Sequence, residues 1–275
     1  MNAIEIKNLS KHYQGFSLDQ LNLTLPSGCI MGLVGENGAG KSTTIRLLLG
    51  MARPDGGEIT VLGGKLDAVR MQRIGVVLDE PGLPSALNAV QIGKLMGGIY
   101  KNWEPQTYDA YLERLSIPLG KSFKEFSKGT KMKLSLAVAL SHGAQLLILD
   151  EATSGLDPVV RDDVLDILNE FTRNEQNSVL ISSHIVSDLE KICDYIAFLH
   201  QGRLMLCREK DELLNEYAFV QGSAEEIDRL DPIGRRDGRF GTEAIVRRCE
   251  IPAGMKTHPI TIEDLFVFMA KEGRE

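Results

Sequence analysis

A glycine-rich stretch that ends in a lysine and two hydroxyl residues is the clearest chemical feature of the sequence. It consists of Gly35, Glu36, Asn37, Gly38, Ala39, Gly40, Lys41, Ser42 and Thr43. In such a loop the glycines let backbone N–H groups turn toward phosphate oxygens, and the start of the following helix adds positive partial charge. Lys41 is expected to reach the β- and γ-phosphates, and the Ser42 hydroxyl is expected to bind Mg²⁺. The stretch predicts a site for a nucleoside triphosphate, and its flanking strand and helix argue against a chance glycine turn.

Two adjacent carboxylates follow an apolar run farther along the chain. The run at residues 146–149 leads directly into Asp150 and Glu151. The carboxyl ends of parallel strands face the region in which nucleotides bind to such sheets. Asp150 suits the Mg²⁺ shell, and Glu151 is placed to polarise an attacking water as a general base. Alone, a strand that ends in Asp-Glu is commonly only a solvated strand end. Together with the glycine-rich loop, it predicts hydrolysis of the triphosphate.

The elements that must position these residues alternate between strands and helices. Sequence patterns predict strands at residues 3–6, 16–25, 29–34, 58–62, 146–149 and 179–182, and a hairpin formed by 196–199 and 203–206. Helical periodicity is expected at 43–49, over much of 84–141, at 159–171 and at 262–271. This alternation favours an α/β fold with a parallel, largely buried sheet and helices on its faces.

A change in the sequence pattern beyond Tyr217 indicates a boundary between two domains. From there on, short strand candidates, Pro and Gly turns and a last amphipathic helix replace the longer alternating elements. We expect residues 1–217 to form the nucleotide-binding domain, with a helical subdomain at about 84–141. Residues 218–275 are expected to form a small C-terminal extension. One large domain with an appendage agrees with the usual domain size of about 100 to 200 residues.

Composition limits the classes to which the protein can belong. Of the 275 residues, 43% are hydrophobic and 25% are charged, and the net charge is −7. These values are ordinary for a globular protein and lack the basic footprint of nucleic-acid binding. The four cysteines lie far apart, so neither a zinc site nor a disulfide framework is expected. No signal-peptide pattern opens the chain, and its apolar stretches fall far short of the roughly 20 residues that span a bilayer. We expect a cytoplasmic protein without a nucleic-acid partner, whose membrane role would come through another chain.

Several shorter motifs occur in an order that resembles the ATP-binding cassette (ABC) ATPases. Residues 126–130, Phe-Ser-Lys-Gly-Thr, stand where that family carries its signature sequence, and residues 154–157, Ser-Gly-Leu-Asp, look like its D-loop. Residues 182–184 are similar to the segment with the family's switch histidine, and Tyr13 stands where the family stacks an aromatic ring on adenine. The resemblance covers roughly residues 3–215. It implies a P-loop NTPase fold, an ABC cassette with a parallel-sheet core, an antiparallel β part and a helical subdomain.

The resemblance also implies a head-to-tail dimer that holds ATP and Mg²⁺ between its subunits. In that arrangement Ser127 and Gly129 contact the γ-phosphate held by the other subunit, and a helix that begins near Ser127 offers N–H donors to an anion. His184 is expected to act at the γ-phosphate, and a purely structural role is the alternative. Tyr13 is expected to stack on adenine, and simple packing is the alternative. The second subunit would be an identical chain or a closely related ATPase.

Three motifs depart from the family pattern. The signature is usually Leu-Ser-Gly-Gly-Gln, but Lys128 and Thr130 occupy its third and fifth places here. Asp79 stands in the position of the Q-loop glutamine, and its carboxylate can ligate Mg²⁺ but cannot donate a hydrogen bond. We expect Asp79 to contact Mg²⁺ or water, and a capping role before Glu80 is the alternative. Ala152 replaces the usual proline after the two carboxylates.

Within the family, the sequence favours a transport motor. Segment 84–124 is short and lacks the heptads of a long coiled coil, and the chain contains only one P-loop pattern. Residues 80–83 and 100–103 are similar to ATPase subunits of bacterial ABC-2-type exporters, and so is the tail. We expect an ATPase subunit that drives a separate membrane permease from the inner face of the cell membrane, in the direction of export. A soluble ABC ATPase that acts on a regulatory or ribosomal partner is the alternative.

A groove for the permease is implied beside the Q-loop, where the family receives a short permease helix. Here it would extend from Leu78 to about Trp103. The apolar side chains available to such a contact are Leu83, Leu87, Ile92, Leu95 and Met96. The alternative is that these residues fill the core of the helical segment itself.

Overall fold

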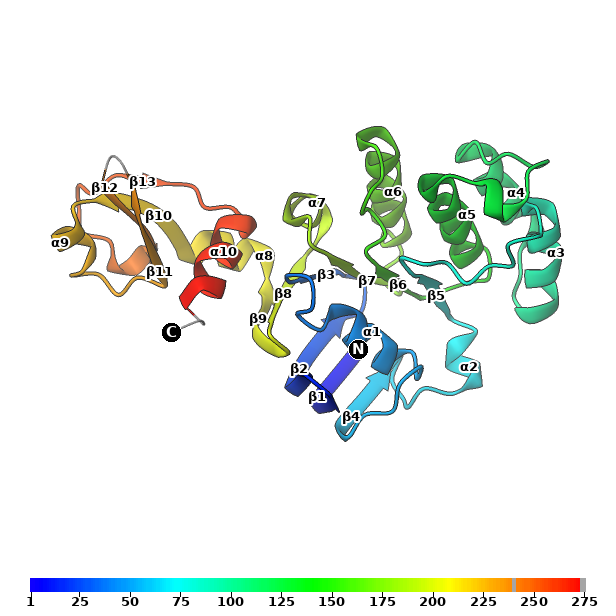
Figure 1. Cartoon of the computed structure of the whole chain (residues 1–275), viewed down its shortest axis with the longest axis horizontal. Coiled ribbons are helices and arrows are strands. Elements are labelled where there is room, and N and C mark those ends of the chain that lie inside the picture. Colours follow the sequence, from blue (N-terminus) through cyan, green and yellow to red (C-terminus); the bar gives the residue numbers. More distant parts are fainter. Residues whose placement is uncertain (239–240, 273–275) are drawn as a thin grey trace.

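A six-stranded sheet forms the centre of the computed structural model, which describes residues 1–238 and 241–272 (Figure 1). Its strands lie in the order β5 (Ile74–Val77), β6 (Leu146–Asp150), β7 (Ser178–Ser183), β3 (Ile30–Val34), β8 (Tyr195–His200) and β9 (Arg203–Glu209). The first five strands are parallel, and β9 pairs with β8 in the antiparallel sense. Strands β3, β6 and β7 and the hairpin of β8 and β9 are present where the sequence predicts them, whereas the edge strand β5 was not predicted. The α/β fold class is confirmed.

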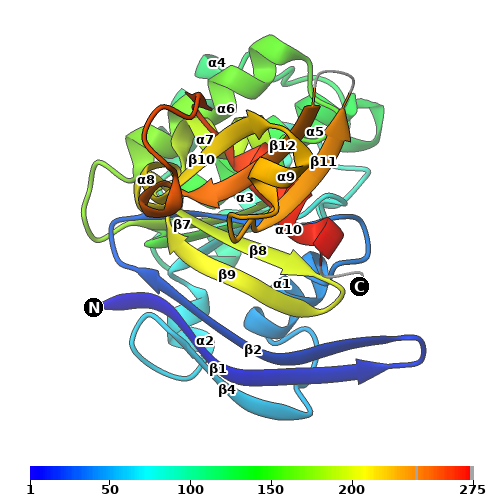
Figure 2. The ribbon, with the colours of Figure 1, turned by 90° about the vertical axis from the view of Figure 1, so that its left-hand side faces the viewer.

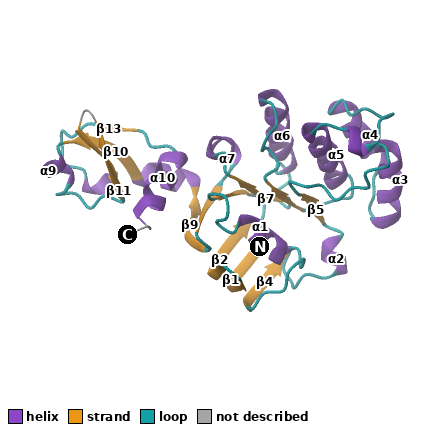
Figure 3. Cartoon of the chain, viewed as in Figure 1, coloured by secondary structure: helices purple, strands orange, loops and turns teal. Residues whose placement is uncertain are grey.

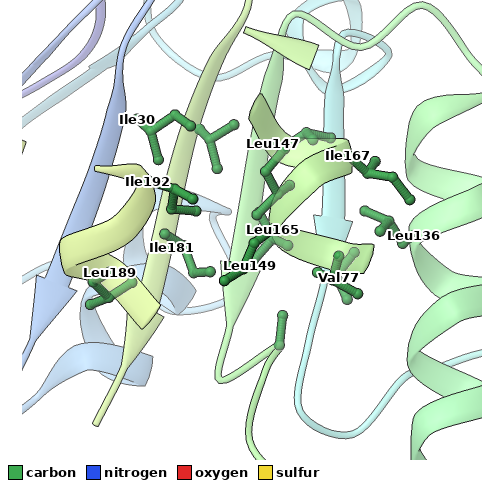
Figure 4. Packing of buried hydrophobic residues seen from close by; sticks show 14 of the residues in the cluster. Ile30, Val77, Leu136, Leu147, Leu149, Leu165, Ile167, Ile181, Leu189 and Ile192 are labelled. Carbon is green, nitrogen blue, oxygen red and sulfur yellow. The ribbon is translucent and has the colours of Figure 1, made fainter. Parts of the chain in front are cut away.

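Both faces of the central sheet are buried, which explains why its strands are apolar runs. Successive side chains of a strand point to opposite faces, so Leu147 belongs to one apolar cluster and Leu146 to the other. Figure 4 shows the first cluster, in which Leu165 packs near the sheet. Two helices supply the covering layer on this face, α6 (Pro158–Phe171) and α7 (Val186–Ile192).

A second, antiparallel sheet packs on the other face of the central sheet. Its strand order is β2 (Phe16–Pro26), β1 (Asn2–Tyr13) and β4 (Gly56–Val61). Its apolar side chains share one cluster with α1 (Lys41–Leu48) and with the second face of the central sheet. Strand β1 extends well beyond the predicted residues 3–6, because it pairs with β2 as far as the contact of Tyr13 with Phe16.

Helices occupy the segment between β5 and β6, as predicted for residues 84–141. They are α3 (Ala89–Ile99), α4 (Pro105–Arg114), the 3-10 helix η1 (Phe123–Glu125) and α5 (Lys128–Leu140), and a short α2 (Ala68–Met71) precedes β5. Figure 3 shows α3, α4 and α5 gathered at one end of the molecule, with α5 nearest to β5. Asn88 and Gln91 form a reciprocal capping box at the start of α3. Ile92 and Met96 are buried in the core of this segment, whereas Leu95 is 40% exposed. Ile92 and Met96 therefore fill the core, and the partner surface expected of them is not formed.

A smaller sheet follows β9, and the last helix returns from it to the central sheet. The sheet order is β11 (Gly234–Gly238), β12 (Gly241–Arg247), β10 (Tyr217–Gly222) and β13 (Thr257–His258), and the helices are α8 (Lys210–Glu216), α9 (Ala224–Ile227), η2 (Arg248–Glu250) and α10 (Ile262–Glu272). Figure 2 shows this sheet in front, above the hairpin of β8 and β9. The Phe266 ring on α10 lies edge-on to Phe198 of β8, with centroids 5.2 Å apart. Helix α10 is thereby anchored to the main apolar cluster.

A buried histidine, His142, connects the end of α5 to the central sheet. Its Nδ1 lies 3.1 Å from the Val138 carbonyl oxygen, and its Nε2 lies 3.2 Å from the Ile74 carbonyl oxygen. Its ring stacks on Tyr100, with centroids 3.9 Å apart. Burial lowers the pKa of His142, and the hydrogen bonds to the two carbonyls oppose this effect. The imidazole is therefore favoured in its neutral form inside the folded chain.

The lowered pKa of His142 makes the folded state sensitive to acid. Because the unfolded chain takes up this proton first, the stability from neutral His142 is complete above the ordinary pKa of about 6.5 and is lost as the pH falls below it. His142→Gln should show a smaller decrease in the free energy of unfolding between about pH 7.5 and about pH 5.5 than the wild type. Urea unfolding at both pH values measures this, and the exposed His258→Gln serves as the control. Equal decreases in His142→Gln and the wild type would contradict the assignment.

Candidate active site

The glycine-rich loop after β3 borders a cavity of about 560 Å³. The cavity is lined by Gly15, Phe16, Glu36, Asn37, Gly38, Gly40, Lys41, Ser42, Thr43, Asp79 and Glu151. The positive end of α1 therefore borders the same space as the loop, an arrangement suited to an anion. Two predicted site carboxylates, Asp79 and Glu151, face this space from other parts of the chain. The predicted site residues that do not line the cavity are Tyr13, Gly35, Ala39, Ser127, Gly129, Asp150 and His184.

Two glycines of the loop are required for structural reasons. A methyl group at Gly35 would lie 2.5 Å from the Leu199 carbonyl oxygen, so no side chain fits between the loop and β8. Gly40 has a φ of 113° directly before α1, in the region that favours glycine. The conformation at Gly40 sets the start of α1 at Lys41, two residues before the predicted start.

The Lys41 ammonium is held at the base of the loop, and its side chain is only 5% exposed. Nζ donates to the carbonyl oxygens of Gly35 at 2.8 Å and Glu36 at 3.3 Å. It also lies 3.1 Å from Oε1 of Glu151. The charge is therefore directed into the cavity by two loop carbonyls and one carboxylate, where phosphate oxygens can pair with it.

Glu151 lies between a lysine and a histidine at the end of β6. Its φ is 52°, which is uncommon for a residue with a side chain and is typical of functional sites. Its backbone N–H donates to Ser182 Oγ at 3.1 Å. Its Oε1 pairs with Lys41, and its Oε2 lies 2.7 Å from Nδ1 of His184, which follows β7. A carboxylate fixed in this way can accept a proton from a water molecule.

Asp150 is the last residue of β6 and is buried. Its Oδ1 accepts a hydrogen bond from Ser182 Oγ at 2.6 Å, and Ser182 lies opposite it on β7. The same hydroxyl accepts from the Glu151 backbone N–H, so Ser182 orients both acidic residues. This role of Ser182 was not predicted from the sequence. The available signal was its place at the end of a parallel strand, next to His184.

Asp79 reaches the cavity, but its carboxylate also has a partner in the same chain. Oδ1 lies 2.6 Å from Nζ of Lys128, the first residue of α5. Both side chains are about half exposed. The two departures from the usual family residues are therefore in direct contact, which neither expectation for Asp79 had included.

The signature residues Ser127 and Gly129 do not line the cavity of their own chain. Ser127 is the N-cap of α5, and its Oγ accepts from the backbone N–H of Thr130 at 3.2 Å. Ser127 is exposed, and Gly129 is partly exposed. The start of α5 is therefore accessible from outside the chain.

Tyr13 lies at the end of β1 and is 46% exposed, but it does not line the cavity either. Phe16, after the following turn, lines the cavity, although the sequence did not predict it as a site residue. Lys11 Nζ lies 5.4 Å from the centroid of the Tyr13 ring and donates to Asp55 at 2.8 Å. That hydrogen bond, together with one from the His12 backbone N–H, lowers the pKa of Asp55 to about 2. The strand end that carries Tyr13 is thus tied to the turn before β4.

A phosphate-binding loop between a parallel strand and a helix, with a carboxylate pair at the end of another strand of the same sheet, defines a P-loop nucleotide hydrolase. The family model for ABC transporters matches residues 18–154. The chain is 30% identical to the ABC transporter ATP-binding protein YhcH of Bacillus subtilis (strain 168), over 99% of this chain and 97% of that protein. It is 35% identical to the bacitracin transport ATP-binding protein BcrA of Bacillus licheniformis, over 74% of this chain and 68% of that protein. A solved ATP-binding subunit of an ABC transporter matches 77% of this chain and 91% of its own length, with a TM-score of 0.68 and 29% identity.

The chain belongs to the ABC transporter family, as an ATP-binding subunit. It is an ATPase, and the resemblance that its motifs indicate is confirmed. The alternative of a soluble ATPase with a regulatory or ribosomal partner is not favoured.

Proposed function

We propose that Glu151 is the general base of ATP hydrolysis and that Lys41 is the principal contact to the phosphates. The observation that carries this proposal is that Glu151, which lines the P-loop cavity, contacts Lys41 through one carboxylate oxygen and His184 through the other. Glu151 accepts the proton of the attacking water, and Lys41 stabilises charge on the β- and γ-phosphates. His184 orients Glu151 through Nδ1 and contacts the γ-phosphate. The backbone of residues 35–43 cradles the phosphates, and Tyr13 stacks on adenine beside Phe16.

We propose that Ser42, Asp150 and Asp79 serve the Mg²⁺ that accompanies ATP. Mg²⁺ prefers oxygen ligands and is usually held by one or two carboxylates together with phosphates and water. Asp150 fits this demand because it is a carboxylate at the strand end and Ser182 fixes one of its oxygens. When bound, the ion neutralises charge that develops on the phosphate oxygens.

We propose that two cassettes associate head to tail, with each signature completing the other's site. The exposed start of α5 and the absence of Ser127 and Gly129 from the described lining of the chain's own cavity support this arrangement. Ser127 and the N–H groups at the start of α5 would contact the γ-phosphate of the partner. The partner is a second copy of this chain or a closely related ATPase.

We propose that residues 1–217 form the nucleotide-binding domain and that residues 218–275 form an extension anchored by α10. Within the described ranges 1–238 and 241–272, none of the helices has the length and apolar character needed to cross a bilayer. A separate permease would supply the membrane passage, and this subunit would act at the inner face of the membrane. The relative BcrA is named for bacitracin transport, which supports export as the direction. No nucleic-acid partner is proposed.

We propose that the permease contact lies on α3, where two large apolar side chains are exposed one turn apart. Leu95 is 40% exposed and Ile99 is 53% exposed. Burial of such a side chain against a partner helix contributes about 1.5–3 kcal/mol, so the double variant Leu95→Glu/Ile99→Glu should weaken docking strongly. We expect stimulation of hydrolysis by the permease in lipid to fall at least about tenfold, because 1.4 kcal/mol corresponds to a tenfold change in binding. Hydrolysis by the isolated subunit should stay within about twofold of the wild type.

The matched control is Val69→Glu on α2, where an apolar side chain is 71% exposed. It introduces the same charge at an apolar surface position outside the proposed contact. Phosphate release is measured for each variant alone and with the permease in vesicles. If the α3 variant remains fully coupled, the docking surface lies elsewhere. If no membrane protein co-purifies with the wild type, the proposal of a permease partner fails.

A further inference from the structure

Asp79 and Lys128, two residues that depart from the family pattern, form an ion pair in the folded chain. Lys128 Nζ lies 2.6 Å from Asp79 Oδ1, although 49 positions separate the two residues in the sequence. Lys128 is the first residue of α5, and Asp79 lies in the segment after β5. Their side chains are 48% and 49% exposed, so water surrounds the pair. An exposed ion pair is weak and exchanges readily when a stronger partner arrives.

Lys128 also lies against the segment that resembles the D-loop. A methyl group at Gly155 would lie 3.7 Å from Cδ and 3.9 Å from Nζ of Lys128. One residue farther along each segment, a methyl group at Gly129 would lie 3.5 Å from Cδ2 of Leu156. The Lys128 ammonium therefore lies where three segments meet, namely the Q-loop, the signature and the D-loop.

The charge of Lys128 stands at an unfavourable place on its own helix. N–H groups at the start of a helix carry positive partial charge, which favours an anion and disfavours a cation. The first turn of α5 contains Lys128 and no acidic residue. Asp79 supplies the compensating negative charge from another segment. Because Asp79 also lines the P-loop cavity, the Mg²⁺ that accompanies a nucleotide there would compete with Lys128 for this carboxylate.

We propose that Lys128 is a further ATP-contacting residue that acts on the nucleotide of the opposite subunit, and that Asp79 holds it until nucleotide binds. The inference rests on the proposed head-to-tail dimer, in which the start of α5 faces the partner's γ-phosphate. When ATP fills the cavity together with Mg²⁺, Asp79 would serve as an oxygen ligand of that cation and release Lys128. The freed ammonium then pairs with the γ-phosphate across the interface, which offers more charge and more acceptor oxygens than one carboxylate. Binding of ATP in the cavity of one subunit thereby frees the lysine that contacts the ATP held by the other subunit.

This exchange predicts effects of opposite sign for the two partners of one ion pair. Lys128→Ala removes the contact to the partner's phosphate and should weaken the ATP-dependent dimer. Asp79→Asn removes the negative charge that holds Lys128 but keeps an amide oxygen for Mg²⁺, and it should strengthen the dimer. If the ion pair were a static link between the Q-loop and α5, either substitution would break it and both would change the dimer in the same direction.

The test uses the full chain with Glu151→Gln, so that ATP remains bound during the measurement. Dimer dissociation constants at saturating ATP and Mg²⁺ are determined by sedimentation velocity, and ATP affinity is determined separately at protein concentrations at which the chain is monomeric. We expect Lys128→Ala to raise the dimer dissociation constant about tenfold or more, the effect of one hydrogen bond to a charged group. Asp79→Asn should lower it about two- to fivefold, the range of an exposed ion pair. Lys128→Ala should leave the ATP affinity of the monomer unchanged.

Two further variants separate the proposed role from a loss of structure. Lys128→Arg should retain most of the dimer affinity, and Asp79→Asn/Lys128→Ala should behave like Lys128→Ala alone, because a released lysine is required for the gain. The exposed Lys124→Ala, on η1 of the same segment, is the matched charge control and should behave like the parent. Equal changes in the same direction for Asp79→Asn and Lys128→Ala, or no change in either, would overturn the inference. If the Glu151→Gln parent itself stays monomeric with ATP, the proposed dimer fails instead.

Discussion

Lys41→Ala should reduce the affinity for ATP by at least about 100-fold, because several charge-assisted hydrogen bonds to the β- and γ-phosphates are lost together. In the folded chain Lys41 Nζ is directed toward the cavity by the carbonyls of Gly35 and Glu36. Alanine removes this cation and leaves Glu151 to face the incoming phosphates without it. The loss of attraction and the added repulsion act in the same direction. Titration of the purified variant with a fluorescent ATP analogue measures the effect.

The control for Lys41→Ala is Lys65→Ala, which removes an exposed lysine outside the cavity. Its affinity should equal that of the wild type. Because Lys41 is buried, urea unfolding of both variants must accompany the titration, so that weak binding is not confused with an unfolded sample. A folded Lys41→Ala with wild-type affinity and normal turnover would remove the glycine-rich loop from the phosphate site.

Most strands of the central sheet could be predicted because each is specified by a short run of its own residues. Residues 146–149 are all apolar, and a strand buried on both faces requires such a run. The glycine-rich loop was equally clear, since Gly40 needs its φ of 113° and Gly35 has no room for a side chain. Each requirement restricts the residue type at one position of the sequence.

The contacts that shape the site were less predictable because they join distant parts of the chain. Asp79 and Lys128 are 49 positions apart, and no periodicity relates a loop after one strand to the first residue of a later helix. Ser182 orients Asp150 and the Glu151 backbone only because β6 and β7 are neighbours in the sheet. Such pairs depend on the strand order, which local patterns do not determine.

Short elements near the C-terminus depended on tertiary contacts in the same way. Helix α8 spans only Lys210–Glu216, and two of its carboxylates, on Glu212 and Glu216, pair with Arg208 of β9. A helix of this length has little stability of its own. For the tail, the sequence predicted strands, turns and a last helix. The pairing of β10 with β12 became visible only in the structure.

Glu151→Gln should slow hydrolysis by roughly 10² to 10⁴-fold while ATP binding is retained, which is the usual contribution of a positioned general base. Glutamine has nearly the same shape and can still bond to His184, but it cannot accept the proton of the attacking water. It also removes the carboxylate that pairs with Lys41, so the lysine becomes fully available to the phosphates. Phosphate release at saturating ATP measures the rate. Unchanged turnover would show that Glu151 is not the base.

The same substitution also tests the arrangement of the two subunits, because ATP that is not hydrolysed stays in the interface. With ATP and Mg²⁺ the Glu151→Gln variant should sediment as a dimer, and with ADP it should sediment as a monomer. Glu170→Gln is the matched control, since it removes the same charge from an exposed pair with Arg114 on α4 and should change turnover by less than about twofold. A slow variant that remains monomeric with ATP would keep Glu151 as the base but contradict the sandwich. A slow and dimeric variant would connect hydrolysis at Glu151 to association of the subunits. The γ-phosphate that the activated water attacks would then also be the group that the signature of the other subunit contacts.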